Sequence, residues 1–69
     1  MRDINRIDIF TLELNKIWKE YFPDWRFGQL MINFLGWVNT SKNRDPFFPE
    51  ETEMLNLLNE YVEKVCKRN

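Results

Sequence analysis

The segment from Phe27 to Ser41 contains no charged residue, and this feature constrains the fold of the chain more than any other. Its apolar side chains recur three and four positions apart, at Phe27, Leu30, Met31, Phe34, Leu35 and Val38. That spacing is typical of an amphipathic helix. The run is too short to span a membrane, and Gln29 and Asn33 interrupt it. We therefore predict a helix over residues 24–40 that lies between two others as the hub of the molecule. In an alternative interpretation, this helix also packs against a second copy.

The segments on either side show the same helical spacing. In the first segment the apolar residues are Ile7, Phe10, Leu14, Ile17, Trp18 and Tyr21. In the last they are Met54, Leu55, Leu58, Tyr61, Val62 and Val65. Pro23 ends the first helix because the residue before a proline is disfavoured in the α region. Asp3 and Asp24 stand where N-caps belong, and Pro49 suits a first turn. These signals predict helices over residues 4–21 and 49–67.

Only two or three residues separate the first two predicted helices, which favours antiparallel neighbours. The pattern contains no strand, repeat or second domain. We predict an all-α protein, a compact three-helix bundle forming a single domain over residues 1–69. A polar loop over residues 39–48 joins the last two helices. Phe47 and Phe48 are predicted to enter the core and fasten this loop, with an exposed pair as the alternative.

The composition narrows the classes of function. The chain of 69 residues is 43% hydrophobic and 16% aromatic, enough to favour a folded domain despite its small size. Ten basic and eleven acidic residues give a formal net charge of −1, which does not favour nucleic acid as a partner. Lys64, Lys67 and Arg68 are interpreted as complementing the carbonyl end of the last helix.

Residues for catalysis and metal binding are scarce. The chain has no histidine, and Cys66 is its only cysteine. An internal disulfide, a thiolate zinc site and an imidazole base are therefore excluded. We predict that the protein is not an enzyme and has no catalytic residues, metal or cofactor. The first ten residues lack the apolar core of a signal peptide, so a cytoplasmic location without a membrane is expected.

One polar ridge follows the predicted middle helix. Arg26, Gln29 and Asn33 stand at positions i, i+3 and i+7, Thr40 extends the line, and Trp37 lies beside it. In one interpretation these side chains form a recognition strip for a protein partner, since Trp and Arg often anchor interfaces. In the other, the ridge faces water and Arg26 holds the loop through an ion pair with an acidic residue. The candidate acids are Asp45, Glu50 and Glu51.

Apolar residues outside the main stripes suggest a second contact surface. Ile9 and Leu12 on the first predicted helix, Ile32 on the second and Leu57 on the third fall off their stripes. Together with the small core they favour a homodimer. Gly28 and Gly36 are interpreted as giving room for a neighbouring helix or a Trp ring. A groove that admits a ligand is the alternative.

Several of these residues belong to one continuous pattern. Arg6-Ile7 and Trp18 precede the run PD-x-R-x-x-Q-L-x-x-N over residues 23–33, and Asp45, Pro46, Phe47 and Glu50 follow it. The pattern resembles that of a family of short uncharacterised proteins of bacteria and their phages, over about residues 6–62. The resemblance implies such an origin, but no activity, cofactor or partner.

The resemblance also places a set of residues at the family's polar positions, namely Asp24, Arg26, Gln29, Asn33 and Asp45. A motif divided between helix and loop suits a structural lock made by Asp24, Arg26, Asp45 and Glu50. The chain departs from the pattern in a longer and more polar loop between Trp37 and Asp45.

These observations favour a non-catalytic module that binds a protein partner or a second copy of itself. The candidate partner-binding residues are Arg26, Gln29, Asn33, Trp37, Ile9 and Leu12. The alternative is a small helical regulator that binds nucleic acid through Arg26, Gln29 and Asn33. The acidic outer face of the third predicted helix, with Glu53, Glu60 and Glu63, makes that helix a poor reader of DNA.

Overall fold

The structure is a computed structural model that describes residues 2–66. It consists of α1 (Asn5–Tyr21), α2 (Phe27–Ser41) and α3 (Glu51–Val65), and these described residues contain no strand. The predicted all-α fold of three helices is confirmed. The predicted helix end at residue 67, with the basic residues Lys67 and Arg68, lies outside the described residues.

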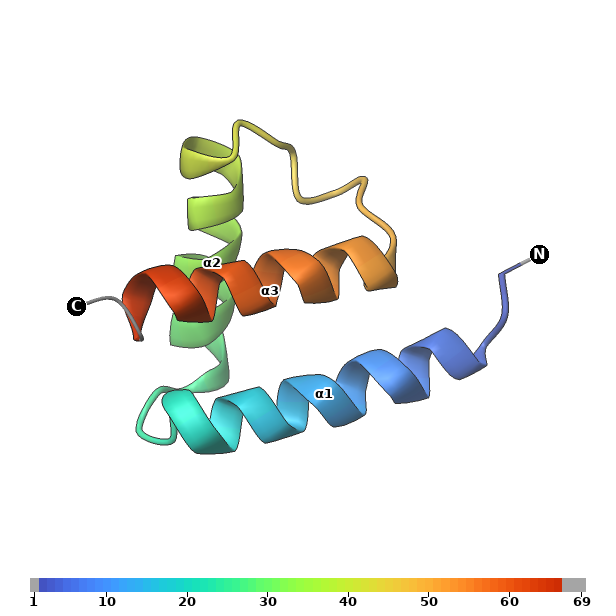
Figure 1. Ribbon diagram of the computed structural model, residues 1–69, viewed down its shortest axis with the longest axis horizontal. Helices are drawn as coiled ribbons and strands as arrows, with labels where there is room; N and C mark the ends of the chain where they lie inside the picture. Colours follow the sequence, from blue (N-terminus) through green and yellow to red (C-terminus); the bar gives the residue numbers. More distant parts are fainter. Residues whose placement is uncertain (1, 67–69) are drawn as a thin grey trace.

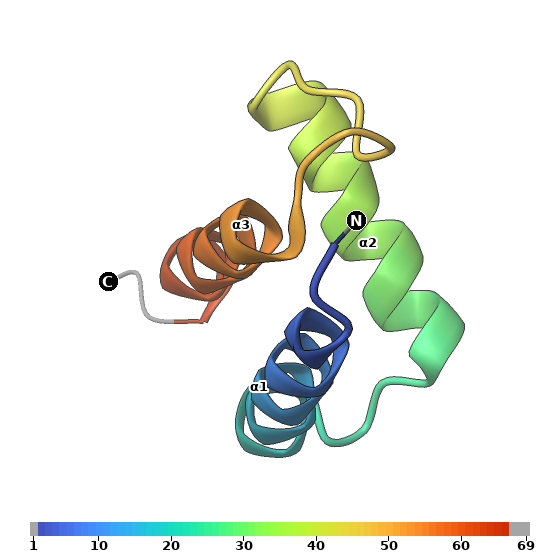
Figure 2. The ribbon, with the colours of Figure 1, turned by 90° about the vertical axis from the view of Figure 1, so that its right-hand side faces the viewer.

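The helices do not follow each other up and down. α1 and α3 run side by side in the same direction, and α2 crosses them at the end where α1 stops (Figures 1 and 2). No Cα atoms of α1 and α2 approach within 8 Å, so the predicted antiparallel pairing of these two helices is wrong. The reason lies in the turn over residues 22–26, which redirects the chain before α2 begins.

Side chains fix this turn. The indole N–H of Trp18 donates a hydrogen bond to the backbone carbonyl of Trp25, with a donor–acceptor distance of 3.0 Å. Phe22 is buried and its ring stacks on that of Trp25, with the ring centroids 4.6 Å apart. The indole of Trp18 also meets Phe27, the first residue of α2, at 6.0 Å between rings. The last turn of α1 thereby sets the direction in which α2 leaves.

The hub of the molecule is α3, and the prediction that the uncharged α2 takes this place is wrong. α3 packs against both other helices. It contributes Leu57, Leu58, Tyr61 and Val62 to the buried core, which Leu30, Phe34 and Val38 of α2 join with Ile17 and Phe22. α2 buries one face only, and its opposite face is open to solvent. The absence of charge along α2 therefore does not reflect burial on all sides.

Leu57 corrects the prediction in another way. It was expected to be a misplaced surface residue, yet it is only 5% exposed. Because α1 and α2 cover different sides of α3, the apolar arc of α3 is wider than one stripe. Tyr61 contacts Phe34 and Trp37 of α2, and Leu57 lies one turn before it on the same side of α3.

Tyr61 is the centre of an aromatic cluster that joins α3 to α2 and to the turn after α1. Its ring centroid lies 5.9 Å from that of Phe22, 5.5 Å from that of Phe34 and 5.3 Å from that of Trp37. Such tilted pairs each contribute about 0.5–1.5 kcal/mol beyond the area they bury. Burial raises the pKa of the Tyr61 phenol, so it remains neutral in this environment at physiological pH.

The helix starts agree only in part with the predicted caps. A carboxylate oxygen of Asp3 accepts the backbone N–H of Asn5 at 2.9 Å, so Asp3 satisfies a donor of the first turn. Asp24 does not cap α2, because that helix starts later, with Arg26 at the N-cap position. The backbone N–H of Arg26 donates to Oε1 of Gln29 at 2.7 Å. This bond is one of the two in a capping box. In the other, the N-cap side chain accepts the backbone N–H of the third helical residue, and a guanidinium cannot accept it.

Some residues assigned to the apolar stripes are exposed, namely Ile7, Phe27 and Val65. Ile7 lies on the same side of α1 as Trp18, but α2 crosses only the far end of α1 and leaves Ile7 uncovered. Phe27 and Val65 stand at the ends of their helices. Gly28 and Gly36 face open space, with nothing within 4 Å of an added Cβ atom, so they do not admit a neighbouring side chain or helix.

The central place of α3 can be tested with two leucines. Leu57→Ala should lower the free energy of unfolding by about 2–5 kcal/mol, because it removes buried methyl groups from a position covered by α2. Leu12→Ala is the matched control, since this leucine on α1 is 58% exposed, and its effect should stay within about 0.5 kcal/mol. Urea unfolding followed by circular dichroism measures both. Equal effects of the two substitutions would contradict the packing of α3.

Gly36→Ala should stabilise the protein. The residue lies inside α2 with room for a methyl group, so alanine should add about 0.5–1 kcal/mol by reducing the entropy of the unfolded chain. The midpoint of thermal unfolding reports this gain. A lower midpoint would show that the outer face of α2 is covered, contrary to the structure.

Candidate interaction surface

The polar ridge (Arg26, Gln29, Asn33 and Thr40) lies on the surface of α2, and all four residues are exposed. Two of them serve the helix itself: Gln29 accepts the N–H of Arg26, and the hydroxyl of Thr40 donates to the carbonyl of Gly36 at 2.9 Å. The guanidinium of Arg26 forms no ion pair with any residue of the described part. The ridge is therefore a solvated strip with one charge.

Trp37 was predicted to stand beside this ridge as an exposed indole. It is half-buried, and its ring packs against Tyr61 and the core. Trp37 does lie one turn after Asn33 on α2, next to the ridge, but its indole packs against the cluster around Tyr61. The ridge therefore lacks the aromatic anchor that an interface of this kind was expected to have.

The predicted lock between Arg26 and the loop is not formed. Glu50 pairs with Arg2 at 2.7 Å, and Asp45 accepts the backbone N–H of Phe47 at 3.0 Å. Asp24 is exposed in the turn between α1 and α2. The cause is the topology: α1 and α3 start at the same end of the molecule, whereas Arg26 stands at the opposite end (Figure 1). The acidic start of α3 thus meets the N-terminal arginines.

Three ion pairs hold acidic residues of α3, and a fourth holds Glu50, the residue directly before this helix. In addition to Arg2 and Glu50, Arg6 contacts Glu51 at 2.8 Å. From the loop after α2, Arg44 contacts Glu53 at 2.6 Å and Lys42 contacts Glu60 at 2.7 Å. Such pairs are each worth little at the surface, but together they position the loop and the N-terminal segment on α3.

Ile9 and Leu12 are exposed on α1, as predicted from their positions off the stripe. Ile9 lines a cleft of about 70 Å³ between α1 and α3, together with Arg6, Phe10, Glu51, Thr52 and Leu55. A cleft of this volume holds a few atoms at most. Ile32 is 75% exposed on the outer face of α2 and stands alone there between the two glycines.

The largest departure from prediction is the aromatic tip, which we define as Phe47 and Phe48. Both side chains are 74% exposed, so the predicted insertion into the core is wrong and the exposed alternative holds. Their ring centroids lie 5.0 Å apart, so the two rings mainly contact each other. The loop is held against α3 by the ion pairs of Lys42 and Arg44 and not by the two rings.

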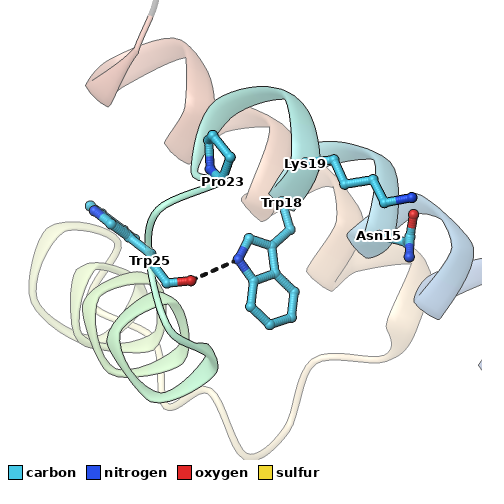
Figure 3. A pocket seen from close by; sticks show the side chains of 5 residues that line it. All are labelled: Asn15, Trp18, Lys19, Pro23 and Trp25. Atoms are coloured by element: carbon cyan, nitrogen blue, oxygen red, sulfur yellow. Dashed lines mark hydrogen bonds between the residues drawn. The ribbon is translucent and has the colours of Figure 1, made fainter.

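An open pocket lies at the other end of the molecule, where α1 turns into α2 (Figure 3). This Trp18 pocket is lined by Asn15, Trp18, Lys19, Pro23 and Trp25 and has a volume of about 330 Å³. Figure 3 shows the indole of Trp18 fixed by its bond to the carbonyl of Trp25, whose own ring turns away. The pocket offers an aromatic surface, a proline ring and, at its rim, an ammonium and an amide.

The described residues include no group of three or more acidic or cysteine side chains placed to hold a metal ion. None of the helices within residues 2–66 combines the length and the apolar character needed to cross a bilayer.

Comparison with protein-family models, curated proteins and solved structures found no match for this chain. The resemblance to short bacterial and phage proteins and the cytoplasmic location therefore remain predictions.

One feature of this surface was missed by sequence reasoning, and the exposed tip was given only as the alternative. Trp25 and Phe22 received no role, because Phe22 follows the predicted end of the first helix and Trp25 precedes the apolar stripe of the second. A tryptophan placed in the last turn before a proline, as Trp18 is, was the available signal for a built turn. For the tip, the signal was the pair of prolines at 46 and 49. They keep the two phenylalanines out of helical structure and so out of the packed stripes.

The ion pairs on α3 predict an acid-sensitive contribution to stability. The hydrogen bond from Arg44 lowers the pKa of Glu53, and that from Arg2 lowers the pKa of Glu50. A carboxyl whose pKa is lower in the folded state stabilises the fold fully above its unfolded value of about 4.3. The contribution is lost as the pH falls through the folded value.

Glu53→Gln should therefore lower the unfolding midpoint at pH 7, and the difference from the wild type should vanish at about pH 2. Glu20→Gln is the control, because this exposed carboxylate has no ion pair within residues 2–66 and its loss should not lower the midpoint. Thermal unfolding followed by circular dichroism at both pH values measures the two variants. A deficit of Glu53→Gln that is unchanged at pH 2 would contradict the assignment.

Proposed function

We propose that this chain is a non-catalytic module that binds protein, and that the aromatic tip makes the contact. The observation that supports the proposal is the exposure of two adjacent phenyl rings, 74% each, on a folded loop. Fully burying one such side chain gains about 1.5–3 kcal/mol. A pair of them can therefore dominate the energy of a small interface.

The loop that presents the tip is ordered by contacts on both sides. Before it, the backbone N–H of Arg44 donates to the carbonyl of Val38 at 3.2 Å, and Asn43 adopts a left-handed conformation with φ of 54°. At the tip, the carboxylate of Asp45 accepts the N–H of Phe47, and its carbonyl accepts that of Phe48 at 3.3 Å. An ordered loop loses less conformational entropy on binding, which favours recognition by this element.

Charge disfavours the alternative of a nucleic-acid regulator. Arg2, Arg6, Lys42 and Arg44 are each engaged by a carboxylate of α3 or its first turn. Phosphate binding would have to break these pairs, and the polar ridge contributes one arginine only. The non-catalytic part of the proposal is supported by the absence of histidine from the chain and by the pairing of its clustered carboxylates.

Photo-crosslinking tests the proposal. We expect Phe47→p-benzoylphenylalanine to give a discrete protein adduct on irradiation in cells, because the tip lies against its partner there. The same group at Asn56, an exposed polar position on α3, should give none and is the matched control. Adducts are detected as shifted bands and identified by mass spectrometry. Equal yields from the two positions would refute the tip as the contact.

A further inference from the structure

We propose that the partner of the aromatic tip is a second copy of this chain, whose Trp18 pocket receives the two phenyl rings. The inference rests on the proposed function and specifies its partner. It joins two features of the described surface, the aromatic tip and the Trp18 pocket. Phe47 and Phe48 are exposed rings, and the pocket is an open recess lined in part by aromatic residues.

The sizes of the two features match. A cavity of about 150 Å³ is enough to bind one benzene molecule in a protein interior. The Trp18 pocket, at about 330 Å³, therefore has room for both rings of the tip. Its walls suit them, because the face of an indole and the ring of Pro23 offer the apolar surface that phenyl groups prefer.

The docking must occur between copies. The pocket adjoins the start of α2, whereas the tip follows its end, and the fifteen residues of this helix span about 22 Å. Figure 1 shows the turn before α2 and the loop after it on opposite sides of α3. A chain thus carries a tip and a pocket that it cannot bring together itself.

Charges at the two features are complementary. Lys19 stands at the pocket rim and forms no ion pair with any residue from 2 to 66. Asp45, directly before the tip, likewise has no cation partner within that range. When the rings enter the pocket, the two groups can pair across the interface. The ammonium is also placed to approach the face of a phenyl ring.

The test uses two variants that are defective on different sides. The tip variant, Phe47→Ser with Phe48→Ser, removes the rings from an exposed loop. The pocket variant, Asn15→Glu with Lys19→Glu, places carboxylates at the rim, where they repel Asp45. Ile32→Ser is the control, because it removes an apolar side chain that is just as exposed on α2. Circular dichroism and the unfolding midpoint verify that each variant is folded.

Sedimentation equilibrium then measures self-association. The wild type and Ile32→Ser should exceed the mass of 8.6 kDa with rising concentration, whereas each double variant alone should bind itself at least tenfold more weakly. An equimolar mixture of the two double variants should regain association, because the intact tip of one fits the intact pocket of the other. This recovery is specific to a tip-into-pocket contact.

Three results would each overturn the inference: a wild type that stays at 8.6 kDa at all concentrations, a double variant that associates like the wild type, or a mixture that shows no recovery. A monomeric wild type whose tip still crosslinks to another protein in cells would refute the self-docking and leave the proposed function intact. Crosslinking at the tip and self-association therefore fail separately.

Discussion

The packing of α3 against two helices whose backbones do not approach each other closely is the contact on which the rest of the structure depends. In a chain of 69 residues the core is small, and one helix must pack against both others to make it continuous. α3 does so by burying two adjacent sides. Leu58 is fully buried, and Tyr61 contacts Phe22 in the turn after α1 and Phe34 of α2. α1 and α2 have no close backbone contact with each other, so each packs mainly against α3. The three helices are therefore joined in one core through α3.

The parallel arrangement of α1 and α3 follows from this packing and places the charges. Both helices start at the same end, so the arginines before and within the first turn of α1 meet the acidic start of α3. A carboxylate at the start of a helix also interacts favourably with its dipole, so Glu50 and Glu51 suit their positions twice over. The loop after α2 must then travel back along α3, and Lys42 and Arg44 hold it there through carboxylates on the exposed side of that helix.

Periodicity was sufficient to predict the three helices, because each has a stripe of apolar residues at helical spacing and polar or proline signals at its ends. It was not sufficient to predict their arrangement. The direction of α2 depends on a bond from Trp18 to the carbonyl of Trp25, a tertiary interaction that no periodic pattern encodes. The absence of charge suggested that α2 is central, but a side chain such as Ile32 shows that uncharged residues also face solvent. The pairing of Glu50 with Arg2 was also missed, because it depends on the tertiary arrangement that places the starts of α1 and α3 at the same end of the molecule.

The distribution of apolar side chains separates what folding requires from what it does not. Within the described residues, as many large apolar side chains are exposed as are buried, and most of the exposed ones stand singly, as is ordinary on protein surfaces. The tip differs because its two rings are contiguous, are presented by an ordered loop, and are not among the ring partners of Tyr61. Exchanging these rings for polar groups would leave unchanged the core, the three ion pairs of α3 and the pair between Arg2 and Glu50. Because the rings of the tip are exposed and lie outside the core, contact with another protein surface is the role that we propose for them.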